Sequence, residues 1–142
     1  MMMAQELRVA RILVIDDEAA IRTMLRDMLE SEGHAVVDAP DGAIAMKRWQ
    51  EQHRDQPFDL IITDILMPEK DGLEVIREVR RLSPGTKVIA ISGGSPQVHV
   101  RFLDIAGHLG AYRTIDKPFA MHTLLDAVHA ALHEPSRHPP AQ

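Results

Sequence analysis

The chain has 142 residues, 45% of them hydrophobic, and its 16 basic and 21 acidic side chains give a formal net charge of −5. This length suits one domain with a real core. The acidic balance argues against a general nucleic-acid binder, which needs a basic face for phosphates. Cysteine is absent, which excludes disulfides, thiolate metal sites and a cysteine nucleophile. With no long apolar run and no signal region at the start, we expect a soluble, cytoplasmic protein.

In chain order, short β-branched runs alternate with longer stretches of helical periodicity. The runs predict strands at 11–15, 35–38, 60–63, 87–91 and 113–115. The periodic stretches predict helices at 21–29, 43–52, 73–80, 98–109 and 121–133. Five such alternations indicate an α/β fold, with a five-stranded, doubly wound parallel sheet between two layers of helices. We expect residues 1–8 to be a flexible arm, 9–133 to be the domain, and 134–142 to be a polar, proline-rich tail.

Polar side chains follow four of the predicted strands. Open α/β sheets carry their sites beyond the carboxyl ends of the strands, so these side chains should meet at one edge. A single acid in such a place is best explained as a helix cap, but acids after two strands, with a lysine opposite, favour a site. The residues are Asp16, Asp17 and Glu18 after the first strand, Asp64 after the third, Ser92 after the fourth and Lys117 after the fifth.

The chemistry of this set points to phosphate and a metal ion. Carboxylates held together repel one another, and a bound cation relieves that repulsion. Oxygen ligands suit Mg²⁺, which binds through one or two carboxylates together with phosphate oxygens. A lysine beside a metal and a carboxylate is typical of sites that stabilise a transferring phosphoryl group.

Four ordered motifs carry a resemblance to a known family. They are the segments at 12–18 (ILVIDDE), 64–72 (DILMPEKDG), 90–93 (AISG) and 117–119 (KPF). In order and spacing the sequence resembles the receiver domain of two-component response regulators, the chemotaxis-regulator type included, over residues 9–133. Four motifs in register are far more specific than a single pair of acids. The fold that the resemblance implies is flavodoxin-like.

The resemblance also implies a role for each matching residue. Asp64 would be the phosphoacceptor, phosphorylated by a sensor histidine kinase or a histidine phosphotransfer protein. Mg²⁺ would be held by Asp16, Asp17, Asp64 and the backbone carbonyl of Leu66. Lys117 would pair with Asp64 and later with the phosphoryl group, to which Ser92 would donate its hydroxyl. Family members commonly have a cis bond at the position of Lys117–Pro118.

Three positions depart from the family pattern. The usual aromatic residue three positions before the lysine is Thr114 here, with Tyr112 two residues earlier. The residues two positions after Asp64 and Ser92 are Leu66 and Gly94, neither of which offers a polar side chain to direct hydrolysis. We therefore expect coupling through the loop after Ser92 rather than through an aromatic ring, and a comparatively long-lived phosphorylated form.

Other polar residues have plainer explanations. His129 and His133 have the i, i+4 spacing that can chelate zinc, but without a third ligand in register a solvated helix face is favoured. Arg22 and Arg26 are likewise expected on a solvated helix face. Trp49 is expected to pack in the core.

These observations predict a stand-alone receiver that signals through protein–protein contact, is not an enzyme, and has no nucleic-acid or membrane partner. The first helix and the loop at Lys117-Pro118 would meet the phosphodonor, and the face of the fourth helix, fifth strand and fifth helix would meet an unknown target protein. The alternatives are a receiver fragment of a larger hybrid kinase or regulator, a Mg²⁺-dependent phosphatase that uses an aspartyl phosphate, and a phosphate-independent interaction module. Turnover of a small phosphoester would favour the phosphatase. Such enzymes generally need a cap or a larger substrate pocket, for which 142 residues leave little room.

Overall fold

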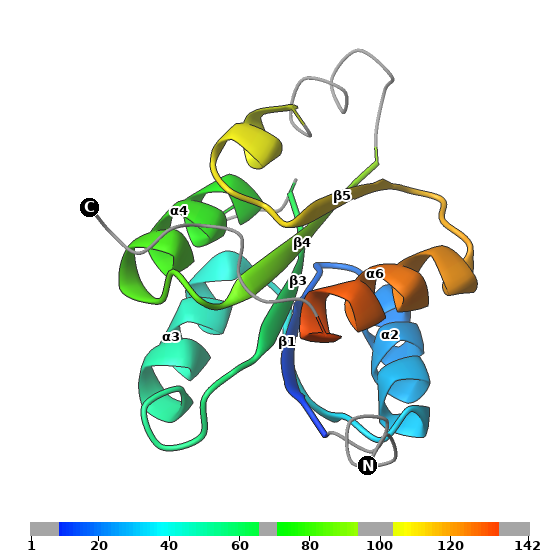
Figure 1. Ribbon diagram of the computed structural model, residues 1–142, viewed down its shortest axis with the longest axis horizontal. Helices are drawn as coiled ribbons and strands as arrows, with labels where there is room; N and C mark the ends of the chain where they lie inside the picture. The colour runs from blue at the N-terminus through cyan, green and yellow to red at the C-terminus, as the bar shows by residue number, and fades with distance from the viewer. Residues whose placement is uncertain (1–8, 66–70, 94–103, 134–142) are drawn as a thin grey trace.

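The computed structural model describes residues 9–65, 71–93 and 104–133, and within them it shows the predicted α/β sandwich (Figure 1). Five parallel strands form one sheet in the order β2-β1-β3-β4-β5. Residues 104–108 are also helical and belong to the predicted fourth helix. The elements with full bounds are β1 (Arg11–Ile15), α2 (Ala19–Ser31), β2 (Ala35–Ala39), α3 (Gly42–Gln52), β3 (Leu60–Asp64), α4 (Gly72–Leu82), β4 (Lys87–Ser92), β5 (Arg113–Asp116) and α6 (Met121–His133).

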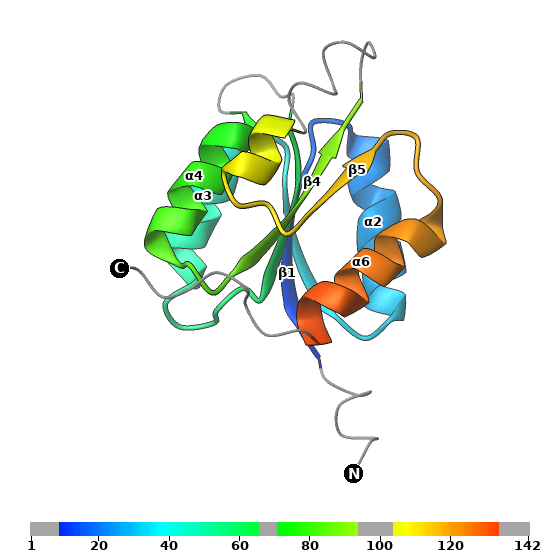
Figure 2. The same cartoon turned by 45° about the horizontal axis from the view of Figure 1, so that its top comes forward.

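Helices cover both faces of the sheet, with α2 and α6 on one side and α3 and α4 on the other (Figures 1 and 2). Side chains alternate along each strand, so β1 sends Ile12 and Val14 into the core under α2 and α6 and Leu13 and Ile15 into the opposite core. Trp49 packs in the second core, as predicted. This double burial explains why the strands read as nearly continuous apolar runs.

Four strands extend one residue beyond their predicted ends. Asp64 and Ser92 are the last residues of β3 and β4 rather than the first residues after them. Asp64 is in register with Ile91, and Ser92 with Asp116. The ladder depends on backbone groups, so a polar side chain at the sheet edge does not end it. The predicted arm at 1–8, the tail at 134–142 and the start of the helix at 98–109 lie outside the described residues.

Aspartates cap two of the helices, but the acids after β1 do not. The side chains of Asp41 and Asp71 accept hydrogen bonds from the N–H groups of Ile44 and Glu74, in the first turns of α3 and α4. By contrast, α2 begins after Glu18 with no side-chain cap. The helix-cap explanation is therefore wrong for Asp16 and Asp17. Within the described ranges, no helix is long and apolar enough to cross a membrane.

Candidate functional site

The carboxyl ends of the central strands bring together residues far apart in the sequence. Asp16 follows β1, Asp64 ends β3, and Lys117 follows β5. The Lys117 ammonium lies 3.0 Å from Asp16 Oδ2, 3.2 Å from Asp64 Oδ2 and 3.2 Å from Glu18 Oε1. One lysine thus stands among three carboxylates, as the strand-end argument predicts for Asp16, Asp64 and Lys117.

The two inner carboxylates are buried, and burial governs their ionisation. Asp16 is 1% exposed and Asp64 is 5% exposed. Burial raises the pKa of Asp64 from 3.8 to about 6, with a further rise from the charge of Asp16 and an opposing effect of Lys117. Burial also raises the pKa of Asp16, against the hydrogen bond from the Glu18 N–H and the attraction of the Lys117 charge. Burial lowers the pKa of Lys117, but its bonds to Asp16 and Asp64 outweigh this and raise it.

One buried oxygen at the site lacks a regular partner. Asp16 Oδ1 accepts a hydrogen bond of 2.9 Å from the Glu18 N–H. Asp16 Oδ2 is buried and has the Lys117 ion pair, but no hydrogen bond of regular geometry among the described residues. The ion pair with Lys117 offsets part of the cost of burying this oxygen, and a bound cation would offset more. One carboxylate oxygen from each of Asp16, Asp17 and Glu18 lies within 4.8 Å of the others. These residues therefore suit a hard cation, which would give Asp16 Oδ2 a further partner.

Two glycines allow the close packing that holds the site. A Cβ at position 72 would lie 2.3 Å from the backbone oxygen of Asp64, so only glycine lets the start of α4 pack against the end of β3. The N–H of Gly72 donates to the backbone carbonyl of Ile65 at 2.9 Å, which fixes that approach. Gly93 is less tightly enclosed: a Cβ there would lie 3.3 Å from Cβ of Lys117, a close contact that a small shift of that side chain would relieve.

The backbone also fixes Lys117 beside the end of β4. Its N–H donates to the carbonyl of Ser92 at 2.7 Å, and the Lys117–Pro118 bond is cis, as the family resemblance suggests. The Ser92 side chain is fully buried, and its hydroxyl donates to the Gly93 carbonyl at a long 3.3 Å. Leu66 and Gly94, and with them the predictions of a carbonyl ligand and of a loop relay, lie outside the described residues.

The predicted departure at the switch position is visible in β5. Thr114 is exposed on the edge strand, in register with Ala90. Tyr112 lies before the strand, is half-buried against the core under α2 and α6, and has Lys87 and Arg113 near its ring. The aromatic side chain is therefore two residues away from the usual position and already packed.

Sequence reasoning missed two neighbours of the acids. Glu18 was placed at the strand end but given no role, although its carboxylate reaches Lys117. Arg22 was expected on a solvated face, yet its side chain is only 20% exposed and donates to the Asp16 carbonyl at 2.7 Å. Both lie within six residues of Asp16, and that nearness is the signal that could have found them.

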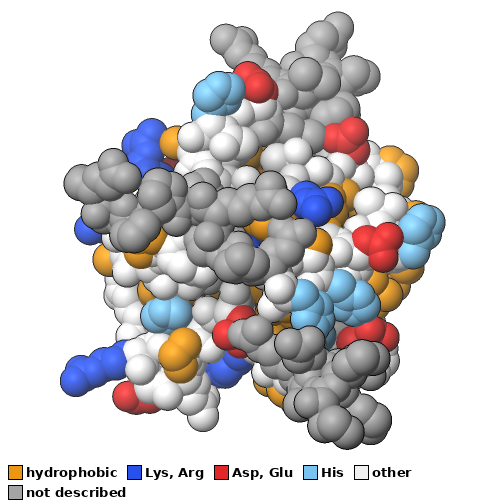
Figure 3. Space-filling view, viewed as in Figure 1, with side chains coloured by type: hydrophobic (Ala, Val, Ile, Leu, Met, Phe, Trp, Pro, Cys, Tyr) orange, Lys and Arg blue, Asp and Glu red, His pale blue; other side chains and the backbone are white. Residues whose placement is uncertain are grey.

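The histidines of α6 lie away from this edge. Histidine side chains gather over α6 beside acidic ones on the face shown in Figure 3. The ring of His129 is half-exposed, with its Nε2 3.3 Å from Glu32 Oε1, and its centroid is 6.4 Å from that of His133. The exposure of the His129 ring agrees with the solvated-face interpretation.

Comparisons with known proteins agree with this fold and site. Residues 12–129 match the response regulator receiver domain family. The chain is 35% identical to the chemotaxis protein CheY of Bacillus subtilis over 123 residues, which cover 86% of this chain and 97% of that protein. It is 36% identical over 132 residues to the DNA-binding transcriptional regulator NtrC of Azospirillum brasilense, covering 93% of this chain but 26% of the relative.

The solved structures give the same result. A CheY-like receiver domain protein from Methanospirillum hungatei superposes with a TM-score of 0.78 at 27% identity, covering 88% of this chain and 94% of that one. The fold and the acidic edge define the class: an α/β signalling domain of the CheY-like type. The chain belongs to the response regulator receiver domain family, whose members bind Mg²⁺ at such an acidic pocket and are typically signalling proteins rather than enzymes.

Proposed function

We propose that the chain is a single-domain response regulator that accepts a phosphoryl group on Asp64 in a Mg²⁺-dependent reaction. The observation that carries the proposal is the placement of a buried Asp64 within 3.2 Å of Lys117, beside the incompletely bonded Asp16. A carboxylate with a pKa of about 6 is ionised at neutral pH and able to act as a nucleophile.

The chemistry follows from these positions. A carboxylate oxygen of Asp64 attacks phosphorus, an O–P bond forms, and the P–N bond of a partner's phosphohistidine breaks. The imidazole leaves with the bonding electrons and takes up a proton. Lys117 keeps its positive charge at Asp64 throughout, and after transfer it can pair with phosphoryl oxygens.

Asp16, Asp17 and Asp64 are the side chains that we assign to Mg²⁺, with the carbonyl of Leu66 as a further ligand. When bound, the ion supplies positive charge that offsets the charge on the phosphoryl oxygens. Within the protein, Asp16 is held by its bond from the Glu18 N–H, whereas Asp17 is exposed at the mouth of the site. Ser92 stands ready at the end of β4 to donate to the phosphoryl group after rotation of its hydroxyl.

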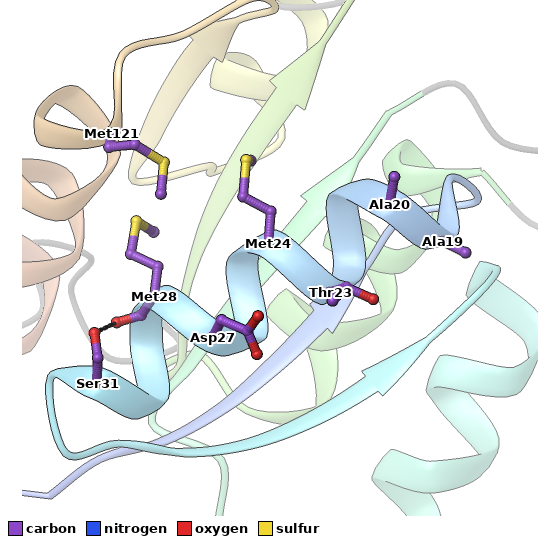
Figure 4. A pocket seen from close by; sticks show the side chains of 8 residues that line it. All are labelled: Ala19, Ala20, Thr23, Met24, Asp27, Met28, Ser31 and Met121. Carbon is purple, nitrogen blue, oxygen red and sulfur yellow. Dashed lines mark hydrogen bonds between the residues drawn. The ribbon is translucent and has the colours of Figure 1, made fainter.

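The phosphodonor is proposed to be a sensor histidine kinase or a histidine phosphotransfer protein that docks beside α2. An apolar groove runs between α2 and α6, where the side chains of Met28 and Met121 point toward one another (Figure 4). Met24 lines both this groove and the hollow lined by Asp64 and Lys117, so the two are neighbours. A donor helix seated in the groove would bring its histidine to Asp64, and flexible methionines suit such a contact.

The output of the phosphorylated chain is proposed to be contact with a target protein. The chain spans nearly all of the CheY relative but about a quarter of the NtrC relative. A receiver fragment of a larger hybrid kinase or regulator is therefore the alternative, and it shares the same chemistry at Asp64.

The test is intact mass after incubation with Mg²⁺ and a small acyl-phosphate donor. Wild type should gain one phosphoryl group, and Asp64→Asn should gain none. Asp55→Asn is the matched control, because Asp55 is also an acid but is exposed, in the loop before β3. A single stable adduct on Asp64→Asn would contradict the assignment of the phosphoacceptor.

A further inference from the structure

Arg22 connects the acidic site with a second charge cluster. It lies in the first turns of α2, and its Nη1 donates to the backbone carbonyl of Asp16 at 2.7 Å. Its Nε lies 3.9 Å from Asp38 Oδ2 on β2. With only 20% of the side chain exposed, the guanidinium is held between these two partners rather than free in solvent.

Asp38 is a firm anchor for that guanidinium. Arg26 Nη2 lies 3.2 Å from its Oδ1, and Arg48 Nη1 lies 3.9 Å from the same oxygen. The backbone of Asp38 is fixed as well, because β2 pairs with β1 and places Asp38 in register with Val14. The guanidinium of Arg22 is therefore held beside Asp16 by Asp38, a residue of strand β2 in the sheet.

A hydrogen bond to the Asp16 carbonyl can orient the next residue, Asp17. On the other side of the residue, the Asp16 N–H donates to the Ala39 carbonyl at 3.2 Å. The Asp16 carbonyl and the Asp17 N–H belong to one planar peptide unit. A donor that fixes this carbonyl therefore fixes the plane from which the exposed side chain of Asp17 leaves the backbone.

We propose that Arg22 is a positioning residue for the cation site, which acts by holding the Asp16–Asp17 peptide so that Asp17 faces the bound ion. The inference rests on the proposed function, since it assigns Asp17 to the ion. It concerns a side chain that touches neither the ion nor the phosphoryl group.

Charge and geometry predict opposite effects at this position. The guanidinium is positive, so if only its charge mattered, its removal would strengthen the binding of Mg²⁺. If Arg22 acts by positioning, its removal weakens binding, because Asp17 then loses its preset orientation. The direction of the change therefore separates the two explanations.

The experiment titrates the full chain with Mg²⁺ alone and follows backbone amide shifts by NMR. Arg22→Gln removes a charged donor from the Asp16 carbonyl, so it should weaken the affinity roughly tenfold. Arg26→Gln is the matched control, because Arg26 shares the contact with Asp38 but, in the described part of the chain, bonds the Val36 carbonyl rather than that of Asp16. Its affinity should stay within about twofold of wild type.

Two further measurements make the test specific. Without the ion, the Asp17 amide should shift and exchange faster in Arg22→Gln but not in Arg26→Gln. Arg22→Lys keeps the charge but loses the planar fork that bonds two partners, so it should stay at least about threefold weaker than wild type.

Equal affinity in Arg22→Gln and Arg26→Gln, tighter binding in Arg22→Gln, or full recovery in Arg22→Lys would each overturn the inference. Failure of the proposed function has a different signature: a wild-type chain that binds Mg²⁺ but gains no mass from the acyl-phosphate donor.

Discussion

Two charge clusters in this domain have opposite compositions. At the sheet edge, Lys117 stands among the carboxylates of Asp16, Glu18 and Asp64. On β2, between α2 on one face of the sheet and α3 on the other, the carboxylate of Asp38 stands among three arginines, Arg22, Arg26 and Arg48. Each cluster has one ion facing three of the other sign, so each carries a surplus of charge.

The two clusters differ in the groups that balance their excess charge. The three arginines are 20–39% exposed, and each donates to a backbone carbonyl in addition to its ion pair with the Asp38 carboxylate. Their surplus charge is thus shared with water, with peptide groups and, for Arg26, with the carboxylate of Glu30 at 3.2 Å. The acids Asp16 and Asp64 are buried, and one oxygen of Asp16 has no regular hydrogen bond in the described structure. A charge imbalance in a buried cluster is therefore relieved by a bound ion, whereas solvent relieves one in an exposed cluster.

Of the changes considered, replacing Lys117 should have the largest effect on the free energy of unfolding. Lys117→Met leaves Asp16 and Asp64 buried without their cation, which should cost about 3–5 kcal/mol of unfolding free energy at pH 7. The loss should shrink near pH 5, where the raised pKa of Asp64 lets it take up a proton. Denaturant unfolding at both pH values measures this. Lys47→Met, at an exposed site on α3, is the control, and an equal loss there would contradict the argument.

Removing the charge of Asp64 should act in the opposite direction. The folded-state pKa is about 6 against 3.8 for an ordinary aspartate, so the folded chain binds more protons between these values and loses stability as pH rises through them. The cost is complete above pH 6 and amounts to about 3 kcal/mol. Without Mg²⁺, Asp64→Asn should therefore be more stable than wild type by about 2–3 kcal/mol at pH 7 and equal to it near pH 4. Unfolding curves that show the variant to be weaker at pH 7 would refute this.

Adding the ion should relieve the acidic cluster alone. Mg²⁺ at ten times its dissociation constant should raise the unfolding free energy by about 1.4 kcal/mol, because it binds only the folded state. Asp17→Ala should lose most of this gain in a thermal melt with and without Mg²⁺. Asp27→Ala, at an exposed acid on α2, should keep it. If both variants respond as wild type does, Asp17 is not a ligand.

Disrupting the arginine cluster should have the smallest effect. Asp38→Asn removes three ion pairs at once, yet these pairs are partly solvated, so the cost should be about 1 kcal/mol and should decrease in high salt. Denaturant unfolding at low and high ionic strength measures it. A loss as large as that of Lys117→Met would mean that exposure is not what separates the clusters.

The positions of the five strands, and the meeting of Asp16, Asp64 and Lys117 at one edge of the sheet, could be predicted from the sequence. The run at 60–63 is β-branched and apolar until Asp64, so the strand end was visible in the residues themselves. The fold rules then place Asp64 beside Asp16 and Lys117, although 53 residues separate Asp64 from Lys117. The exact ends could not be predicted, because Asp64 and Ser92 keep their backbone pairing in spite of polar side chains.

Contacts between side chains on different helices and strands could not be predicted from the sequence. Helical periodicity places Arg22 and Arg26 on the polar side of α2, but it does not show that Asp38 on β2 faces them. The prediction of a solvated face was therefore wrong for Arg22. Glu18 reaches Lys117 across 99 residues, and its rotamer decides that contact.

The missing side chain of Gly72 has a consequence for how mutations would be tolerated. Asn can replace Asp64 without a change of shape, so the fold survives the loss of its nucleophile. No larger residue can replace Gly72 without moving the Asp64 backbone, since even a methyl group would overlap the carbonyl oxygen there. Fewer amino acids are therefore tolerated at position 72 than at position 64, although Gly72 takes no part in the chemistry.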